Sequence, residues 1–235
     1  MNLLKLTDEK LALLRQEVVN ECGRRTRAAV EGLDPGQLVR GNELAKRAVV
    51  VAAAGKHSLL FMGAKNSGKT MLRAVAYALG LEEVFEFLPC PCGEYSDPTR
   101  ACSCTIAQMT RHLSKLPGAD ISVEVFRPRE RDFHSLGSSL ADMQRQLAEA
   151  VPFEHVSMIL PEVCQHLLRI SAQEMSLDPV SRAAVLSVAR TIATLDRKTE
   201  IGPAHLCEAI NYRALRARIA AASPRRSKPA KRRVA

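Results

Sequence analysis

The spacing of apolar and polar residues predicts helices over most of this chain. Apolar residues recur at helical spacing among charged ones from Thr7 to about Leu33, which predicts a long amphipathic helix that ends at Asp34-Pro35-Gly36. Shorter patterns of the same kind, several bounded by Gly, Thr or Pro, predict further helices. These helices are expected over residues 43–54, 69–79, 105–116, 138–150, 161–175, 179–195 and 203–221.

Three short apolar stretches predict β-strands, over Ser58–Met62, Glu83–Leu88 and Ile121–Phe126. Helices separate these strands in the chain, so we expect a small parallel sheet and an α/β fold. Beyond the charged linker that begins at Arg127, every segment has a helical pattern. The expected organisation is an N-terminal helix (1–34), an α/β core (35–127), a helical subdomain (128–222) and a disordered basic tail (223–235).

A phosphate-binding pattern, G-x-x-x-x-G-K-T, stands between the first predicted strand and the next helix. Gly63 and Gly68 permit a tight turn whose backbone N–H groups face an anion. Lys69 would reach the outer phosphates, and Thr70 would offer its hydroxyl to Mg²⁺. An ordinary surface turn is the alternative, but the strand before the loop and the helix after it favour the phosphate-binding interpretation.

Composition and charge limit the classes of function. Of the 235 residues 46% are hydrophobic but only 4% aromatic, which favours packed helices with an aliphatic core over an all-β sandwich. No apolar run approaches the roughly 20 residues of a membrane span, so a cytoplasmic protein without membrane contact is expected. The net charge of +9 is concentrated in the tail, which would either bind nucleic acid through phosphates or keep the chain soluble. Its cations are Arg225, Arg226, Lys228, Lys231, Arg232 and Arg233.

Four of the seven cysteines lie close together in a segment rich in Pro and Gly. Cys90 and Cys92 form one C-x-C pair, and Cys102 and Cys104 form a second after nine intervening residues. Four thiolates in a cytosolic chain suit tetrahedral Zn²⁺, although C-x₂-C is the more usual spacing, and reduced thiols in a loop are the alternative. The other cysteines, Cys22, Cys164 and Cys207, are expected in the core.

Three blocks of the sequence, Val39–Gly63, Pro89–Cys104 and Leu186–Arg213, resemble the magnesium chelatase-like AAA+ ATPases, especially their ComM (YifB) competence-protein branch. The resemblance implies a P-loop AAA+ core with a helical lid, ATP and Mg²⁺ as cofactors, an oligomer and action near DNA. It also implies that Arg190 is the lid arginine that contacts the phosphates. The expected nucleotide-binding residues are Gly63, Ala64, Lys65, Asn66, Ser67, Gly68, Lys69, Thr70, Met71 and Arg190.

The chain departs from this family pattern where hydrolysis is carried out. Only Leu81–Leu88 stands where the family carries the segment with the acidic Walker B motif, and no apolar run of the sequence ends in Asp-Glu. Leu88 replaces the Asn that senses the γ-phosphate, and Ser114–Asp120 lacks the arginine that would reach a neighbour's nucleotide. Because the missing strands lie together at one edge of the family's sheet, the other three would stay neighbours around a central first strand. The new edge would need a cover, from the N-terminal helix or a partner.

These observations lead to two hypotheses of different classes. The first is an ATP-binding AAA+ protein that acts in a homo- or hetero-oligomer near DNA, with weak or absent hydrolysis of its own and no identified catalytic residue. The second is a non-enzymatic, zinc-stabilised DNA-binding or scaffold protein with a vestigial phosphate loop. A small P-loop kinase would need an acceptor site and a catalytic carboxylate that the sequence does not reveal.

Overall fold

The computed structural model describes residues 34–222, except 96, 98, 99, 135, 151–155 and 158. The chain divides into two units, residues 1–34 and 35–235, and the second is described below. Two predictions, the amphipathic helix over residues 7–33 and the basic tail from residue 223, fall outside the described residues.

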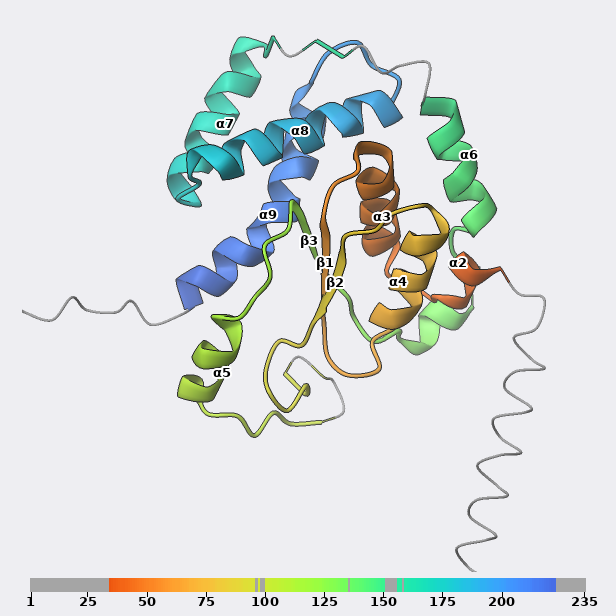
Figure 1. Ribbon diagram of the computed structural model, residues 1–235, viewed down its shortest axis with the longest axis vertical. Helices are drawn as coiled ribbons and strands as arrows, with labels where there is room; N and C mark the ends of the chain where they lie inside the picture. Colours follow the sequence, from red (N-terminus) through yellow and green to blue (C-terminus); the bar gives the residue numbers. More distant parts are fainter. Residues whose placement is uncertain are drawn as a thin grey trace, which may run out of the picture. The chain divides into compact units, whose positions relative to one another are not determined.

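The centre of the fold is a parallel sheet of three short strands, β1 (Leu59–Met62), β2 (Val84–Phe87) and β3 (Ile121–Glu124). Their order is β2-β1-β3, and all four residues of β1 are buried (Figure 1). An apolar strand flanked on both sides is typical of the inside of a parallel sheet. The predicted α/β fold and the central position of the first strand are therefore confirmed.

Two helices of the first half pack beside the sheet. Helix α3 (Glu43–Gly55) contacts β1, β3 and α8, and its three valines are buried together with Ala45, Ala48 and Ala52. Helix α4 (Lys69–Ala78) contacts β2 and α3, and the short α2 (Pro35–Leu38) packs on α4. The aliphatic core that the composition predicted thus lies around β1 and α3.

The second half of the unit is helical, as the sequence predicts. It contains α6 (Leu140–Ala150), α7 (Glu162–Glu174), α8 (Pro179–Leu195) and α9 (Pro203–Ala222). Helix α8 packs on α9 and α3, while α9 also runs along β3. Helices α8 and α9 share the core with the sheet, and residues 35–222 lie in one compact unit. The predicted domain boundary at residue 127 stays a prediction.

Local hydrogen bonds explain where the elements differ from the predicted bounds. Strand β3 ends at Glu124 because the side chain of Asn42 takes over the backbone of Phe126, accepting from its N–H and donating to its carbonyl at 2.9 Å. Helix α5 (Ile106–Leu113) begins, as predicted, after Thr105, which forms a capping box with Gln108.

Two predicted irregular segments contain helical turns. The expected break at Asp34-Pro35-Gly36 leads directly into α2, and the charged linker forms a 3₁₀ turn, η2 (Glu130–Phe133). The Asp132 carboxylate begins that turn by accepting from the Arg129 backbone N–H at 2.7 Å. Within the described part of the chain, no helix is both long and apolar enough to cross a bilayer.

Candidate functional site

The phosphate-loop sequence joins the carboxyl end of β1 to the first turn of α4, as predicted. Gly63 lies so close to the third strand's exit that a Cβ there would stand 2.1 Å from the carbonyl oxygen of Val125. Gly68 has a φ of 96°, which L side chains rarely adopt. Both glycines are therefore required by the backbone itself, independently of any ligand.

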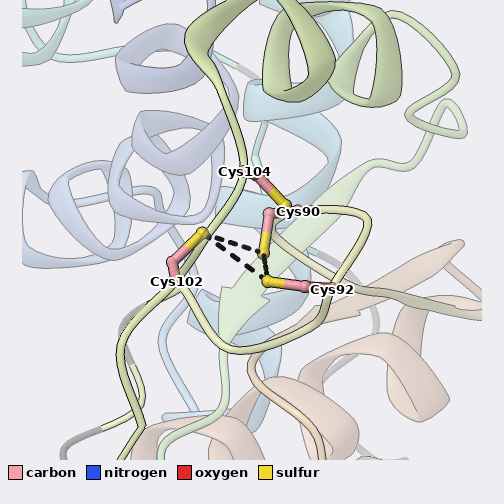
Figure 2. A group of neighbouring side chains, drawn as sticks. All are labelled: Cys90, Cys92, Cys102 and Cys104. Carbon is pink, nitrogen blue, oxygen red and sulfur yellow. Dashed lines mark hydrogen bonds between the residues drawn. The ribbon is translucent and has the colours of Figure 1, made fainter.

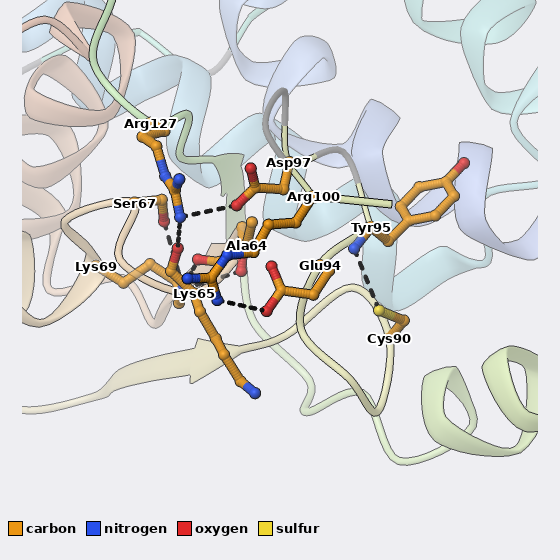
Figure 3. Close-up of polar contacts among 11 residues, drawn as sticks. Ala64, Lys65, Ser67, Lys69, Cys90, Glu94, Tyr95, Asp97, Arg100 and Arg127 are labelled. Carbon is orange, nitrogen blue, oxygen red and sulfur yellow. Dashed lines mark hydrogen bonds and ion pairs between the residues drawn. The ribbon is translucent and has the colours of Figure 1, made fainter. Parts of the chain in front are cut away.

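Lys69 is folded into this loop and its side chain is mostly buried, with 8% of the residue exposed. Its ammonium donates to the carbonyl oxygens of Gly63 (2.9 Å) and Ala64 (2.7 Å) and to Ser67 Oγ (3.3 Å) (Figure 3). Burial lowers the pKa of Lys69, and the nearby Glu86 carboxylate acts against that shift. The loop thus holds a cation among oxygen atoms at the N-terminus of a helix, where an anion is favoured.

Thr70 follows at the first turn of α4 and contacts an acidic residue of the neighbouring strand. Its hydroxyl donates to Glu86 Oε2 at 3.0 Å. The other oxygen of Glu86 lies 3.1 Å from Arg73 Nε, one helical turn further along α4. A carboxylate on β2 therefore lies beside the hydroxyl that the motif assigns to the metal ion.

The four cysteines of the C-x-C pairs come together, as the zinc interpretation requires (Figure 2). Their sulfur atoms all lie within 4.8 Å of one another, and three of the Sγ–Sγ distances are 3.3, 3.6 and 3.7 Å. Four sulfurs at a Zn–S distance of about 2.3 Å would lie about 3.8 Å apart at the corners of a tetrahedron. The cluster consists of Cys90, Cys92, Cys102 and Cys104, and its geometry fits Zn²⁺.

Backbone N–H groups donate to these sulfurs and favour the thiolate form of Cys92, whereas burial and hydrogen bonds within the cluster raise the pKa values of Cys102 and Cys104. The Tyr95 N–H donates to Cys90 Sγ at 3.3 Å. Hydrogen bonds from the Glu94 backbone and from the Cys90 thiol lower the pKa of Cys92 to about 6. By contrast, burial raises the pKa of Cys164, which lies in the core as predicted, whereas Cys207 is exposed and the core prediction is wrong for it. Cys207 is exposed because it lies on the outer side of α9. Cys22 falls outside the described residues.

The cysteine segment is hydrogen-bonded to the phosphate loop. The Lys65 N–H donates to the Gly93 carbonyl at 2.9 Å, and the Lys65 carbonyl accepts from Arg127 Nη2 at 3.2 Å. Arg127 also pairs with Asp97, whose side chain is fully buried, at 2.8 Å (Figure 3). Both the amide and the carbonyl of Lys65 are thus fixed by segments that follow β2 and β3, the strands on either side of β1. We call these contacts the Lys65 clamp.

Arg190 is placed away from this site. It is exposed on α8, and the next residue, Thr191, forms a 2.8 Å hydrogen bond with His57, just before the amino end of β1. The phosphate loop begins at the opposite end of that strand, and the extended chain from His57 to Gly63 spans about 20 Å at about 3.3 Å per residue. Figure 1 shows α8 and the loop at opposite ends of the sheet. Contact of Arg190 with a nucleotide stays a prediction, and this placement does not support it within one chain.

The remaining predicted residues follow the loop. Lys65 and Asn66 are exposed at its tip, Ser67 is buried against Lys69, and Met71 is 42% exposed in the first turn of α4. Sequence reasoning missed two residues. Glu86 is the single acidic residue in β2, and that position in an apolar strand was a signal that could have marked it. Arg127 gave no such signal in the sequence, because its partners are distant in the chain.

Comparison with known proteins now adds to this geometry. Residues 37–82, which include the phosphate loop, match the family model "Magnesium chelatase, subunit ChlI", and residues 118–213 match the model of its C-terminal region. The competence protein ComM of Haemophilus influenzae is 43% identical over 68 residues. That match covers 27% of this chain and 12% of ComM, so the chain spans a small part of its relative's length. The fold, the phosphate loop and both matches agree: the chain belongs to the magnesium chelatase-like AAA+ family, in the branch that includes ComM.

Proposed function

We propose that this chain binds ATP with Mg²⁺ on Gly63–Thr70 and hydrolyses it slowly or not at all by itself. The observation that carries the proposal is the position of Lys69 in a glycine-framed loop between β1 and α4. Its ammonium is held by two backbone carbonyls and a hydroxyl, neutral partners that phosphate oxygens would replace with ion pairs. Family membership supports the same class of ligand.

Each residue of the loop has a defined task in binding. The first N–H groups of α4 have no partner within the helix and favour an anion at its N-terminus. Lys69 would neutralise phosphate charge, and Thr70 would contribute its hydroxyl to the metal ion. Bound Mg²⁺ would itself neutralise charge on the phosphates. The Lys65 clamp holds the loop in one backbone conformation, so the loop would lose little conformational entropy when a nucleotide binds.

Hydrolysis needs groups that the described residues do not bring to the loop. A water molecule must be positioned and activated beside the γ-phosphate. Leu88, at the exit of β2, has no polar atom for that task, and Arg190 lies at the other end of β1. We propose that a second copy or another AAA+ subunit supplies the missing groups in an oligomer.

The four-cysteine cluster supports a structural zinc ion in the same protein. The ion would fix the segment after β2, from which Gly93 contacts Lys65 of the phosphate loop and Asp97 contacts Arg127. The cluster also suits the second hypothesis, a zinc-stabilised scaffold with a vestigial loop. DNA association through the basic tail and a cytoplasmic location remain proposals from the sequence alone.

The test compares purified full-length wild type with Lys69→Ala, and with Lys115→Ala as a control that removes an exposed lysine elsewhere. Fluorescent ATP binding and phosphate release are measured on each. The proposal predicts binding by the wild type and the control, a loss of at least tenfold in Lys69→Ala, and phosphate release close to background. Equal binding by all three proteins would show that the loop is vestigial.

A further inference from the structure

Glu86 is an acidic residue in an otherwise apolar strand, Val-Phe-Glu-Phe. It stands opposite Phe61 of β1, two residues before the phosphate loop begins. Its side chain is only 20% exposed and reaches the first turn of α4. Because burying a carboxylate is costly, such a residue is retained only with compensating partners.

The two partners of Glu86 are placed on either side of its carboxylate. Oε2 accepts from the Thr70 hydroxyl at 3.0 Å, and Oε1 pairs with Arg73 at 3.1 Å. Arg73 balances the charge of Glu86 at this position. The other oxygen is directed at the residue that the phosphate-loop motif assigns to Mg²⁺.

We infer that Glu86 is the carboxylate that holds nucleotide-bound Mg²⁺ in this chain, in place of the acidic motif that the sequence lacks. The inference rests on the proposed ATP binding. Mg²⁺ prefers octahedral oxygen ligands at about 2.0–2.1 Å, so two adjacent ligands lie about 2.9 Å apart. The 3.0 Å separation between the Thr70 and Glu86 oxygens matches that spacing.

A single carboxylate at the metal ion would also explain why this chain could bind ATP without hydrolysing it. Mg²⁺ bound with a nucleotide commonly needs one or two carboxylates beside the phosphates. Glu86 supplies one, and it already contacts Thr70 and Arg73, so a carboxylate that activates water would have to be a different residue. The site that results would hold the metal–nucleotide complex and release it unchanged.

The experiment measures how much Mg²⁺ tightens ATP binding. ATP is titrated calorimetrically into full-length wild type, Glu86→Gln and the control Glu82→Gln, first in Mg²⁺ and then in EDTA. Glu82 is an exposed residue shortly before β2. We expect wild type and control to bind ATP about tenfold more tightly with Mg²⁺, and Glu86→Gln to lose most of that gain while keeping its affinity in EDTA.

A second readout is Mn²⁺ bound in the ternary complex, measured by electron paramagnetic resonance. Glu86→Asp, which keeps the charge but withdraws the oxygens by one methylene, should also weaken Mn²⁺ and serves if Glu86→Gln does not fold. An unchanged Mg²⁺ gain and unchanged Mn²⁺ affinity in these variants would overturn the inference while leaving ATP binding intact. No ATP binding by the wild type in either buffer would overturn the proposed function and this inference together.

Discussion

Replacing Arg127 by Met tests the clamp that connects the cysteine segment to the phosphate loop. The change removes a guanidinium that lies 2.8 Å from the Asp97 carboxylate and 3.2 Å from the Lys65 carbonyl, while keeping an apolar stem of similar length. Asp97 would then remain fully buried without the Arg127 charge beside it. We expect a clear loss of stability, because charge burial rather than packing is altered.

The burial of the two partners sets the magnitude. Removing one partner of a fully buried ion pair costs about 3–5 kcal/mol. Arg127 is 25% exposed, so water can replace part of its contact, and we expect a loss of about 2–3 kcal/mol. For a chain of this size that corresponds to a melting temperature lower by about 5–10 °C.

Thermal melting and urea titration of the full chain measure this effect. Arg131→Met is the matched control, because Arg131 is exposed and lies 3.9 Å from Asp132, and it should change stability by less than about 0.5 kcal/mol. Adding Asp97→Asn to Arg127→Met removes the buried charge and should recover much of the loss. If Arg127→Met and Arg131→Met melt at the same temperature, the clamp does not stabilise the fold.

Three further predictions test other parts of the structure. Purified wild type should contain one zinc ion per chain by elemental analysis; Cys102→Ser should lose it, whereas Cys207→Ser, at an exposed position, should keep it. Burial lowers the pKa of His57, so the unfolded chain binds a proton more readily below the ordinary value of about 6.5. The free energy of unfolding should therefore fall from pH 7 to pH 5, and His57→Gln should flatten that fall; parallel profiles would refute the assignment. Thr105→Ala removes the capping box of α5 and should cost about 1 kcal/mol in urea titrations, against no measurable change if the cap is dispensable.

The sequence predicted those parts of the molecule that depend on local patterns. The glycines and Lys69 of the phosphate loop follow a short motif, and the apolar run before them marks β1. Helices α7, α8 and α9 start at Pro or Asp residues that can be read without tertiary information. The C-x-C pairs likewise bring four sulfurs together within one short segment.

Residues whose role depends on distant partners could not be predicted in this way. Arg127 belongs to a charged stretch that resembles a solvated linker, yet it reaches Lys65, 62 residues earlier, and the buried Asp97. Glu86 alternates with apolar residues as an exposed strand residue would, and only the β1–β2 register brings it to Thr70. For Arg190 the local sequence predicted a contact with the nucleotide, but its helix packs at the end of β1 opposite the phosphate loop.

The central claim is that the loop from Gly63 to Thr70 binds a nucleoside triphosphate. Isothermal titration of purified full-length protein with MgATP tests it most directly, with Lys69→Ala measured in parallel. We predict a saturable binding heat in the wild type and its loss in Lys69→Ala, since Lys69 is the cation that the loop holds for phosphate. A wild type that gives no binding heat at millimolar ATP, or a variant that binds as well as the wild type, would contradict the account.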